Sequence, residues 1–172
     1  MPLPDLTISK FGIQVGRFYR QPFTFIRIIT VNIIEKFCQL YAELHNADLS
    51  ALGTIYTEHV EFIDPITEHH GLQALTAYLS ALTAQTETCY FDIHDVHSSG
   101  SGQPVSCTIT WTMRLTLKSG SRKVTLDGVS LLRFDNNKIW FQRDYYDLGE
   151  MVYEHIPVLS WIINKIKQRL AS

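Results

Sequence analysis

The stretch Phe62-Ile63-Asp64-Pro65 places a carboxyl group directly after an apolar run and directly before a proline. Because proline donates no hydrogen bond to a β-ladder, residues 60–63 are predicted to form a short strand that ends at this acid. A second stretch, Arg143-Asp144-Tyr145-Tyr146-Asp147, again sets an acid among aromatic residues. A carboxylate is costly to desolvate, so each of these acids requires a hydrogen-bonding partner or a chemical role.

The composition is typical of a single globular domain. The chain has 172 residues, of which 45% are hydrophobic and 19% charged. Its net charge of −2 is uneven, because residues 35–160 hold sixteen acidic and eight basic side chains and both ends are basic. A nucleic-acid-binding domain carries a basic face on its folded body, so a nucleic-acid partner is not expected.

The sequence contains no recognisable metal or cofactor motif. The three cysteines are far apart and lack a C-x-x-C pair, which argues against a disulfide framework and a zinc site. The apolar run 23–34 is too short and too polar to span a bilayer, and no clear secretory signal is present. We therefore expect a cytoplasmic protein without a metal or cofactor.

Three helices are predicted in the first half from apolar residues that recur at three- and four-residue steps. The first covers residues 31–45. The second is short, has Asp48 as its N-cap and covers 49–56. The third follows Gly71 and covers 72–82.

The second half predicts long strands at residues 89–96, 105–117, 123–134 and 138–146. In the second of these, Ile109, Trp111 and Met113 alternate with polar residues, and Arg114 falls on the polar side. Helices followed by strands indicate an α+β fold. We expect a cone-shaped, curved, mainly antiparallel sheet, with three N-terminal helices that enclose a cavity and an extra C-terminal helix.

The two ends are expected to lie outside this domain, which spans residues 31–147. Residues 1–30 contain three prolines, two glycines and no sustained period, so they predict a poorly ordered arm. One hypothesis is that translation begins near Val31, which the intact mass of the native protein tests. Residues 148–172 form a helical extension with basic residues near its end. Such a helix suits an anionic membrane surface, but packing on the sheet, on a dimer mate or at the cavity mouth is favoured.

The order of these elements and several motifs resemble the nuclear-transport-factor-two-like superfamily, which includes SnoaL-like polyketide cyclases, ketosteroid isomerases and limonene epoxide hydrolases. The resemblance covers residues 31–147, and the segment from residue 153 to 170 is similar to an uncharacterised bacterial SnoaL-like subgroup. It implies a cone-shaped fold and a homodimer formed through the sheet. It leaves the activity open, because this superfamily hosts many chemistries and many non-enzymes. The stretches that carry it are Leu44-His45-Asn46-Ala47-Asp48-Leu49, 60–65, 132–139 and 143–147.

The sequence lacks part of the catalytic residue set of both the ketosteroid isomerases and the limonene epoxide hydrolases. Asp64 occupies the place of the isomerases' proton-shuttling aspartate, but their two oxyanion donors fall on Leu40 and Ser130. Leucine donates nothing, and Tyr41 beside it is expected to be turned about 100° away along the helix. Steroid isomerase activity is therefore not expected.

Of the epoxide hydrolases' Asp-Arg-Asp trio, the resemblance assigns two members to Arg114 and Asp144 and places Thr116 at the third. Two of three is not a working acid and base. What this predicts is an Arg114–Asp144 ion pair in or at the rim of the cavity, with Trp140 and Tyr146 on the same strand face as Asp144.

Two further pairs of residues are given structural interpretations. His69-His70 is expected in a solvated loop, since no third metal ligand is suitably spaced. Asp127-Gly128 lies within a strand and predicts a bulge or close packing.

These observations predict a pocket for a small, mostly apolar or carbonyl-containing molecule. In an enzyme, Asp64 or Asp144 acts as general base without a cofactor, in isomerase- or cyclase-like chemistry. Alternatively the same residues bind a ligand without changing it, or the domain is a protein-interaction module. Asp64 as a turn cap and Asp144 as a structural bridge also stay open. The expected pocket residues are Phe62, Asp64, Arg114, Trp140, Asp144 and Tyr146.

Overall fold

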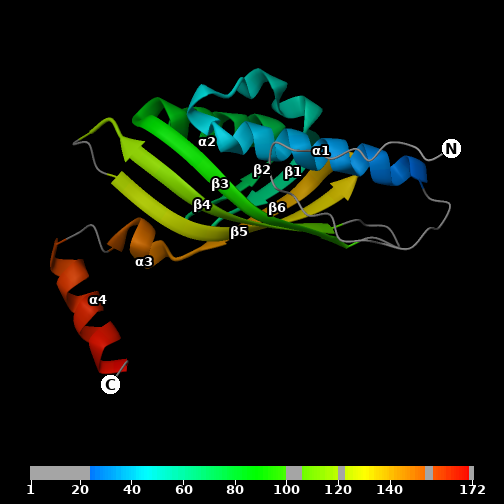
Figure 1. Cartoon of the computed structure of the whole chain (residues 1–172). Helices are drawn as coiled ribbons and strands as arrows, with labels where there is room; N and C mark the ends of the chain where they lie inside the picture. Colours follow the sequence, from blue (N-terminus) through cyan, green and yellow to red (C-terminus); the bar gives the residue numbers. More distant parts are fainter. Residues whose placement is uncertain (1–23, 100–105, 120–122, 154–156, 171–172) are drawn as a thin grey trace, which may run out of the picture.

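The computed structural model describes residues 24–99, 106–119, 123–153 and 157–170. It has the α+β architecture that the sequence predicts (Figure 1). The first half contains α1 (Thr24–Ala42), the 3-10 segments η1 (Leu44–Asn46) and η2 (Leu49–Thr54), β1 (Tyr56–Ile63), β2 (Glu68–His70) and α2 (Leu72–Gln85). The second half contains β3 (Thr86–Ser99), β4 (Ser106–Leu117), β5 (Lys123–Asp135), β6 (Lys138–Tyr146), α3 (Leu148–Met151) and α4 (Pro157–Leu170).

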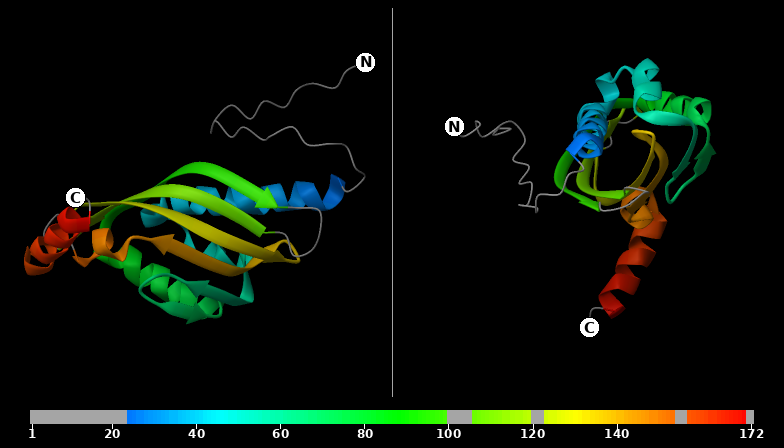
Figure 2. Two further views of the ribbon diagram at one scale, coloured as in Figure 1. Left: turned by 90° about the horizontal axis from the view of Figure 1, so that it is seen from below. Right: turned by 90° about the vertical axis from the view of Figure 1, so that its right-hand side faces the viewer.

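The six strands form one curved sheet in the order β2-β1-β6-β5-β4-β3. All neighbouring strands are antiparallel except β1 and β6, which run parallel. The sheet bends around one side of the molecule, and α1 and α2 cover its inner face (Figure 2). Because β1 lies beside β6, the ends of these two strands bring Asp64 and Asp144 into the same region of the sheet.

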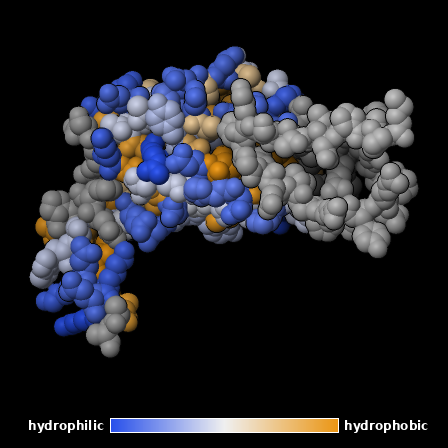
Figure 3. Space-filling model, viewed as in Figure 1, coloured by the Kyte–Doolittle hydropathy of each residue, from blue (hydrophilic) through white to orange (hydrophobic). Residues whose placement is uncertain are grey.

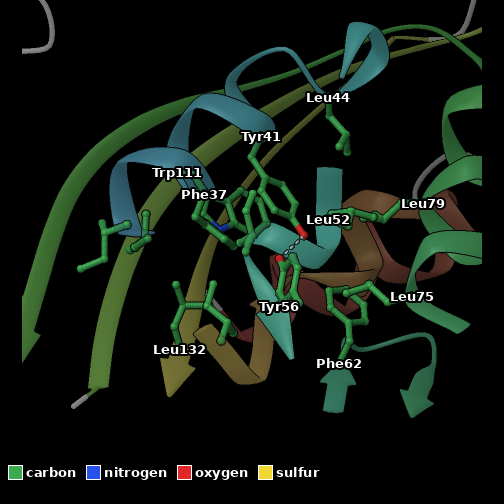
Figure 4. Close-up of a cluster of buried hydrophobic side chains, with 14 of the residues drawn as sticks. Phe37, Tyr41, Leu44, Leu52, Tyr56, Phe62, Leu75, Leu79, Trp111 and Leu132 are labelled. Carbon is green, nitrogen blue, oxygen red and sulfur yellow. Dashed lines mark hydrogen bonds between the residues drawn. The ribbon is translucent and has the colours of Figure 1, made fainter. Parts of the chain in front are cut away.

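The core lies between the helices and the inner face of the sheet. Phe37, Tyr41 and Leu44 recur at helical spacing and are almost fully buried against it (Figure 4). The expected alternation of the 105–117 strand is found in β4, where Ile109, Trp111 and other odd-numbered residues are buried.

Three local predictions differ from the structure. Tyr56 begins β1 instead of ending the second helix, and its buried side chain pairs in register with Ile139 of β6. The short helix is a 3-10 segment, although Asp48 caps it as predicted by accepting a hydrogen bond from the Ser50 N–H at 3.0 Å. His69-His70 lies in strand β2, paired with β1, instead of in a loop.

The start of the cone domain differs from the expected boundary. Helix α1 begins at Thr24, so the boundary expected at residue 30 falls inside it. Residues 1–23, which form the rest of the expected arm, lie outside the described residues. Within the described part of the chain, no helix combines the length and apolar character that crossing a bilayer requires.

Candidate functional site

Asp64 follows directly on β1 and is held by three hydrogen bonds. Its Oδ1 accepts the backbone N–H groups of Ile66 at 2.7 Å and Thr67 at 2.8 Å, the turn geometry that an aspartate before proline favours. Its Oδ2 accepts the hydroxyl of Tyr78 from α2 at 2.7 Å. One oxygen therefore shapes the turn, as the structural interpretation of Asp64 expected, while the other belongs to a side-chain cluster.

An aromatic wall stands beside Asp64. The Tyr78 ring centroid lies 5.5 Å from that of Phe62 and 4.5 Å from that of His69. Burial, followed by the hydrogen bond to Asp64, raises the pKa of Tyr78 well above its usual value, so this hydroxyl keeps its proton. The Nε2 atom of His69 is buried and finds no hydrogen-bond partner among the described residues.

Asp144 lies on β6 and is buried among donors. Its Oδ1 accepts the Ser130 hydroxyl at 2.6 Å and the Gln142 Nε2–H at 3.0 Å, whereas its Oδ2 has only a longer 3.1 Å contact with the same Gln142 nitrogen. Ser130 stands directly opposite Asp144 in the β5–β6 register. A proton on neutral Asp144 therefore belongs on Oδ2, because Oδ1 already accepts the closest donor.

These contacts belong to a longer buried network in which each hydrogen-bond donor is oriented toward Asp144. Trp111 can only donate, and its Nε1–H binds the Ser130 oxygen at 2.9 Å, so the Ser130 hydroxyl donates onward to Asp144. On the other side, the Tyr56 hydroxyl donates to Gln142 Oε1 at 2.6 Å and lies 3.1 Å from the Tyr41 hydroxyl (Figure 4 shows the two tyrosines). Both arms thus point their donors toward Asp144.

The electrostatics of Asp144 are unusual for an aspartate. Burial raises its pKa to about 7, against the lowering effect of the hydrogen bonds from Ser130 and Gln142, and the nearby charge of Asp64 raises it further. Near neutral pH this group therefore exists in both the acid and the carboxylate form.

Tyr146, also on β6, joins the two carboxyl groups into one site. Its pKa is raised first by burial and then by the charges of Asp64 and Asp144. Four of the expected pocket residues therefore gather here: Phe62, Asp64, Asp144 and Tyr146.

Arg114 is not part of this site, and the expected Arg114–Asp144 ion pair is wrong. The Arg114 Nε binds Asp92 Oδ2 of the neighbouring strand β3 at 2.7 Å, with side chains 59% and 51% exposed. Its neighbours Met113 and Leu115 are buried, so the alternation of β4 turns Arg114 to the outer face. A pair this exposed contributes little to stability.

Trp140 is also outside the site, because the β5–β6 register shifts between Arg133 and Phe134. Arg133 pairs with Phe141 and Phe134 with Ile139, which leaves Trp140 as the extra residue of a bulge. The Trp140 ring packs on Phe141, and the guanidinium of exposed Arg133 lies 5.9 Å from its centroid. The prediction that Trp140 shares the strand face of Asp144 is therefore wrong.

Several residues of the site were not recognised from the sequence. Tyr41 was expected to point away, yet it is 4% exposed and lies in the buried network, while Leu40 is only half-buried. Tyr78 and Gln142 gave no signal beyond helix and strand spacing. The available signal for Gln142 was its place two residues before Asp144 on the same strand face.

Gly128 provides a direct test of the network. As expected for close packing, it lies opposite Trp111 in the β4–β5 register, and an added Cβ would fall 2.2 Å from the indole ring. Gly128→Ala is therefore expected to displace a rigid buried ring, break its hydrogen bond to Ser130 and lower the free energy of unfolding by about 1–3 kcal/mol. Urea denaturation measures this. A variant as stable as the wild type, with unchanged Trp111 environment in the near-UV spectrum, contradicts it.

Two surface pockets lie away from the carboxyl groups. One borders the start of α2, beside Glu58 and His70, and the other lies along α4 beside Trp161. Asp64 and Asp144 are each 9% exposed, so a ligand reaches them only if neighbouring side chains move. Within the described ranges, no three histidine, cysteine or acidic side chains are arranged to hold a metal ion.

Comparison with known proteins identifies the family of this chain. The family model of the SnoaL-like domain matches residues 37–142, which is more than half of the chain and contains both β1 and most of β6. The chain belongs to the SnoaL-like domain family. No curated protein matches it in sequence.

Solved structures agree on the fold. A proposed SnoaL-like polyketide cyclase from Jannaschia is 12% identical, with a TM-score of 0.64, and the match covers 78% of this chain and 94% of that one. A nuclear-transport-factor-two-like protein of unknown function from Burkholderia pseudomallei is 18% identical, with a TM-score of 0.62 and coverage of 72% and 95%. A protein with a ketosteroid isomerase-like fold from Catenulispora acidiphila, in complex with trimethylamine, is 19% identical, with a TM-score of 0.59 and coverage of 69% and 87%. At these identities the likeness concerns the fold alone.

Proposed function

We propose that this SnoaL-like protein is a cofactor-free acid–base enzyme that acts on a small, mostly apolar molecule containing a carbonyl group. The observation that supports this most is the pair of neighbouring carboxyl groups in different surroundings. Asp64 accepts three hydrogen bonds, which suit its carboxylate form, whereas burial raises the pKa of Asp144 to about 7. Two carboxyl groups whose environments differ in this way supply one acid and one base.

The proposed chemistry assigns one step to each group. Asp64 Oδ2, oriented by Tyr78, removes a proton from the carbon beside the carbonyl, and the C–H electron pair forms the enolate. The neutral Asp144 keeps its proton and donates a hydrogen bond from Oδ2–H to the oxygen on which negative charge develops. The proton then returns from Asp64. Return to the same carbon gives hydrogen exchange, and return to another carbon gives isomerisation. If the enolate carbon instead attacks a second carbonyl, the new C–C bond closes a ring, the C=O electron pair moves to its oxygen, and the resulting alkoxide takes the proton held by Asp64.

This assignment replaces the oxyanion donors that the resemblance placed at Leu40 and Ser130. Ser130 does not face the substrate directly in this proposal, because its hydroxyl donates to Asp144 across the β5–β6 pair. The proposed oxyanion donor is thus Asp144 on β6 in place of Ser130 on the neighbouring strand β5. Gln142, which donates to Asp144, is held in turn by the Tyr56 hydroxyl, and the Tyr41 hydroxyl lies beside that of Tyr56.

Hydrogen–deuterium exchange tests the proposal without knowledge of the natural substrate. The protein is incubated in D2O with small cyclic ketones, 1,3-diketones, steroid-like ketones and terpenoid ketones, after native mass spectrometry has selected the compounds that bind. The wild type is expected to introduce deuterium beside the carbonyl of at least one bound compound. Bound compounds that all exchange at the rate of a protein-free control would contradict the enzymatic proposal.

A non-catalytic binding function is the alternative. It is favoured by the low exposure of both acids and by the hydrogen bonds that already occupy Asp64 and Oδ1 of Asp144. In that case ligands bind without exchange. A homodimer formed through the sheet, which the family resemblance implies, is part of either proposal, and sedimentation equilibrium measures it.

A further inference from the structure

Helix α4 exposes its apolar side chains instead of burying them. Val158 is 69% exposed, Trp161 65%, Ile166 52% and Leu170 83%. The helix extends away from the sheet and from α1 and α2 (Figures 1 and 2), and its surface shows hydrophobic residues among hydrophilic ones (Figure 3). The packing on the sheet that the sequence favoured is therefore not found for this helix, and its apolar face has no cover within the described chain.

The side chains around α4 are arranged in three zones. Val158, Ile162, Ile166 and Leu170 follow one another at four-residue steps, so at about 100° per residue they form one continuous apolar arc. Ser160, Asn164 and Gln168 repeat at the same step on the opposite side, which carries no charge. Lys165 and Lys167 flank the arc on its two sides, and Arg169 projects from within the arc at the last turn of the helix.

This distribution restricts the occupant of the apolar arc. Residues 157–170 contain three cations and no acidic side chain. In a parallel pair of α4 helices the cations of the two copies would lie side by side, and in an antiparallel pair they would face the other copy's N-terminal half, which has no acidic side chain to pair with them. Self-pairing of α4 would therefore provide no complementary charge for its cations.

The body of a second copy is acidic but offers little apolar surface in return. Outside α4, the described chain exposes only four large apolar side chains to this degree, and they belong to different elements: Ile66, Tyr90, Tyr145 and Tyr153. An occupant must provide both negative charge and a continuous apolar layer beneath it. The surface of an anionic phospholipid bilayer provides both.

We propose that α4 docks on the surface of a bilayer that contains anionic phospholipids. The apolar arc enters the boundary between headgroups and acyl chains, and the long stems of Lys165 and Lys167 let their ammonium groups reach the phosphates. Trp161, which lies beside Lys165 with 5.0 Å between the ammonium and the ring centroid, sits at headgroup depth. The helix lies on the bilayer and does not cross it, in agreement with its length.

Vesicle flotation of the full-length protein tests this docking. With vesicles of phosphatidylcholine containing phosphatidylglycerol, the wild type is expected to float. Binding to pure phosphatidylcholine is expected to be weaker by about tenfold or more. Raising the salt concentration to 1 M should release much of the bound protein, because the charge attraction is screened.

Two matched double variants separate the apolar arc from general charge. Ile162→Asp with Ile166→Asp places two acids in the arc, and is expected to reduce binding to anionic vesicles by about a hundredfold or more. Asn164→Asp with Gln168→Glu adds the same charge on the opposite face, and is expected to reduce binding by only about tenfold. Circular dichroism checks that both variants keep the fold.

Three results would overturn the proposal. The first is a wild type that does not float with anionic vesicles. The second is equal flotation with neutral and anionic vesicles. The third is an equal loss of binding in the two double variants. An oligomer that dissociates only in the Ile162→Asp, Ile166→Asp variant, without any vesicle binding, would assign α4 to a protein interface instead.

Discussion

Asp64→Asn is expected to abolish carbonyl-directed proton exchange while leaving the fold intact. The asparagine retains an oxygen for the backbone N–H groups of Ile66 and Thr67, so the turn after β1 can form. It has no basic carboxylate oxygen to take the proton. Loss of a positioned general base typically lowers a rate by about 10² to 10⁴-fold, and we expect a loss of this size in deuterium incorporation measured by mass spectrometry.

Asp48→Asn is the matched control for this experiment. Asp48 also accepts the N–H of the residue two positions ahead, Ser50, but it lies on the surface and caps η2. It is expected to exchange at the wild-type rate. If Asp64→Asn still binds the ketone and exchanges it within about threefold of the wild-type rate, Asp64 is not the base, and its hydrogen bonds serve only the turn and the cluster.

Asp144→Asn is expected to make stability less dependent on pH. Burial raises the pKa of Asp144 from 3.8 to about 7 in the folded protein. At pH 3 the folded and unfolded chains both hold this proton, so the group contributes no penalty. Between about pH 4 and 7 the unfolded chain releases the proton first, and the free energy of unfolding falls by up to about 1.4 kcal/mol per pH unit. Above pH 7 the penalty is complete, on the order of 4 kcal/mol.

The measurement compares urea denaturation of wild type and Asp144→Asn at pH 4 and pH 8. The variant is expected to gain stability relative to the wild type as the pH rises, by a few kcal/mol in total. Using the difference between the two pH values cancels any constant effect of the new amide. Ser130→Ala should shift the transition to higher pH, since the Ser130 hydrogen bond lowers the pKa of Asp144. A variant whose stability relative to the wild type is the same at both pH values contradicts the raised pKa of this acid.

The sequence predicts most of the fold because its patterns are local. The apolar spacing of α1, the alternation of β4 and the proline after Asp64 each determine an element without reference to distant residues. The three polar residues of β2 gave no such pattern, because this strand depends on pairing with β1. Tyr56 likewise follows the helical spacing, but its pairing with Ile139 makes it part of a strand.

The site is predicted less completely because its contacts are distant in sequence. Tyr41 and Gln142 are 101 positions apart, and no local period links them. For Arg114, the alternation of its own strand placed the side chain on the outer face of the sheet, whereas the family resemblance assigned it to the cavity. The alternation was the better guide. For Trp140 the alternation itself fails, because a bulge adds one residue and reverses the face.

The protonation state of Asp144 is the feature on which the proposed acid–base function most depends. It can be followed directly by ¹³C NMR of protein labelled at the aspartate carboxyl carbons, with the Asp144 signal assigned by its absence from the Asp144→Asn spectrum. The account predicts a titration midpoint near pH 7. A midpoint below about pH 5, in the ordinary range for aspartate, would contradict it.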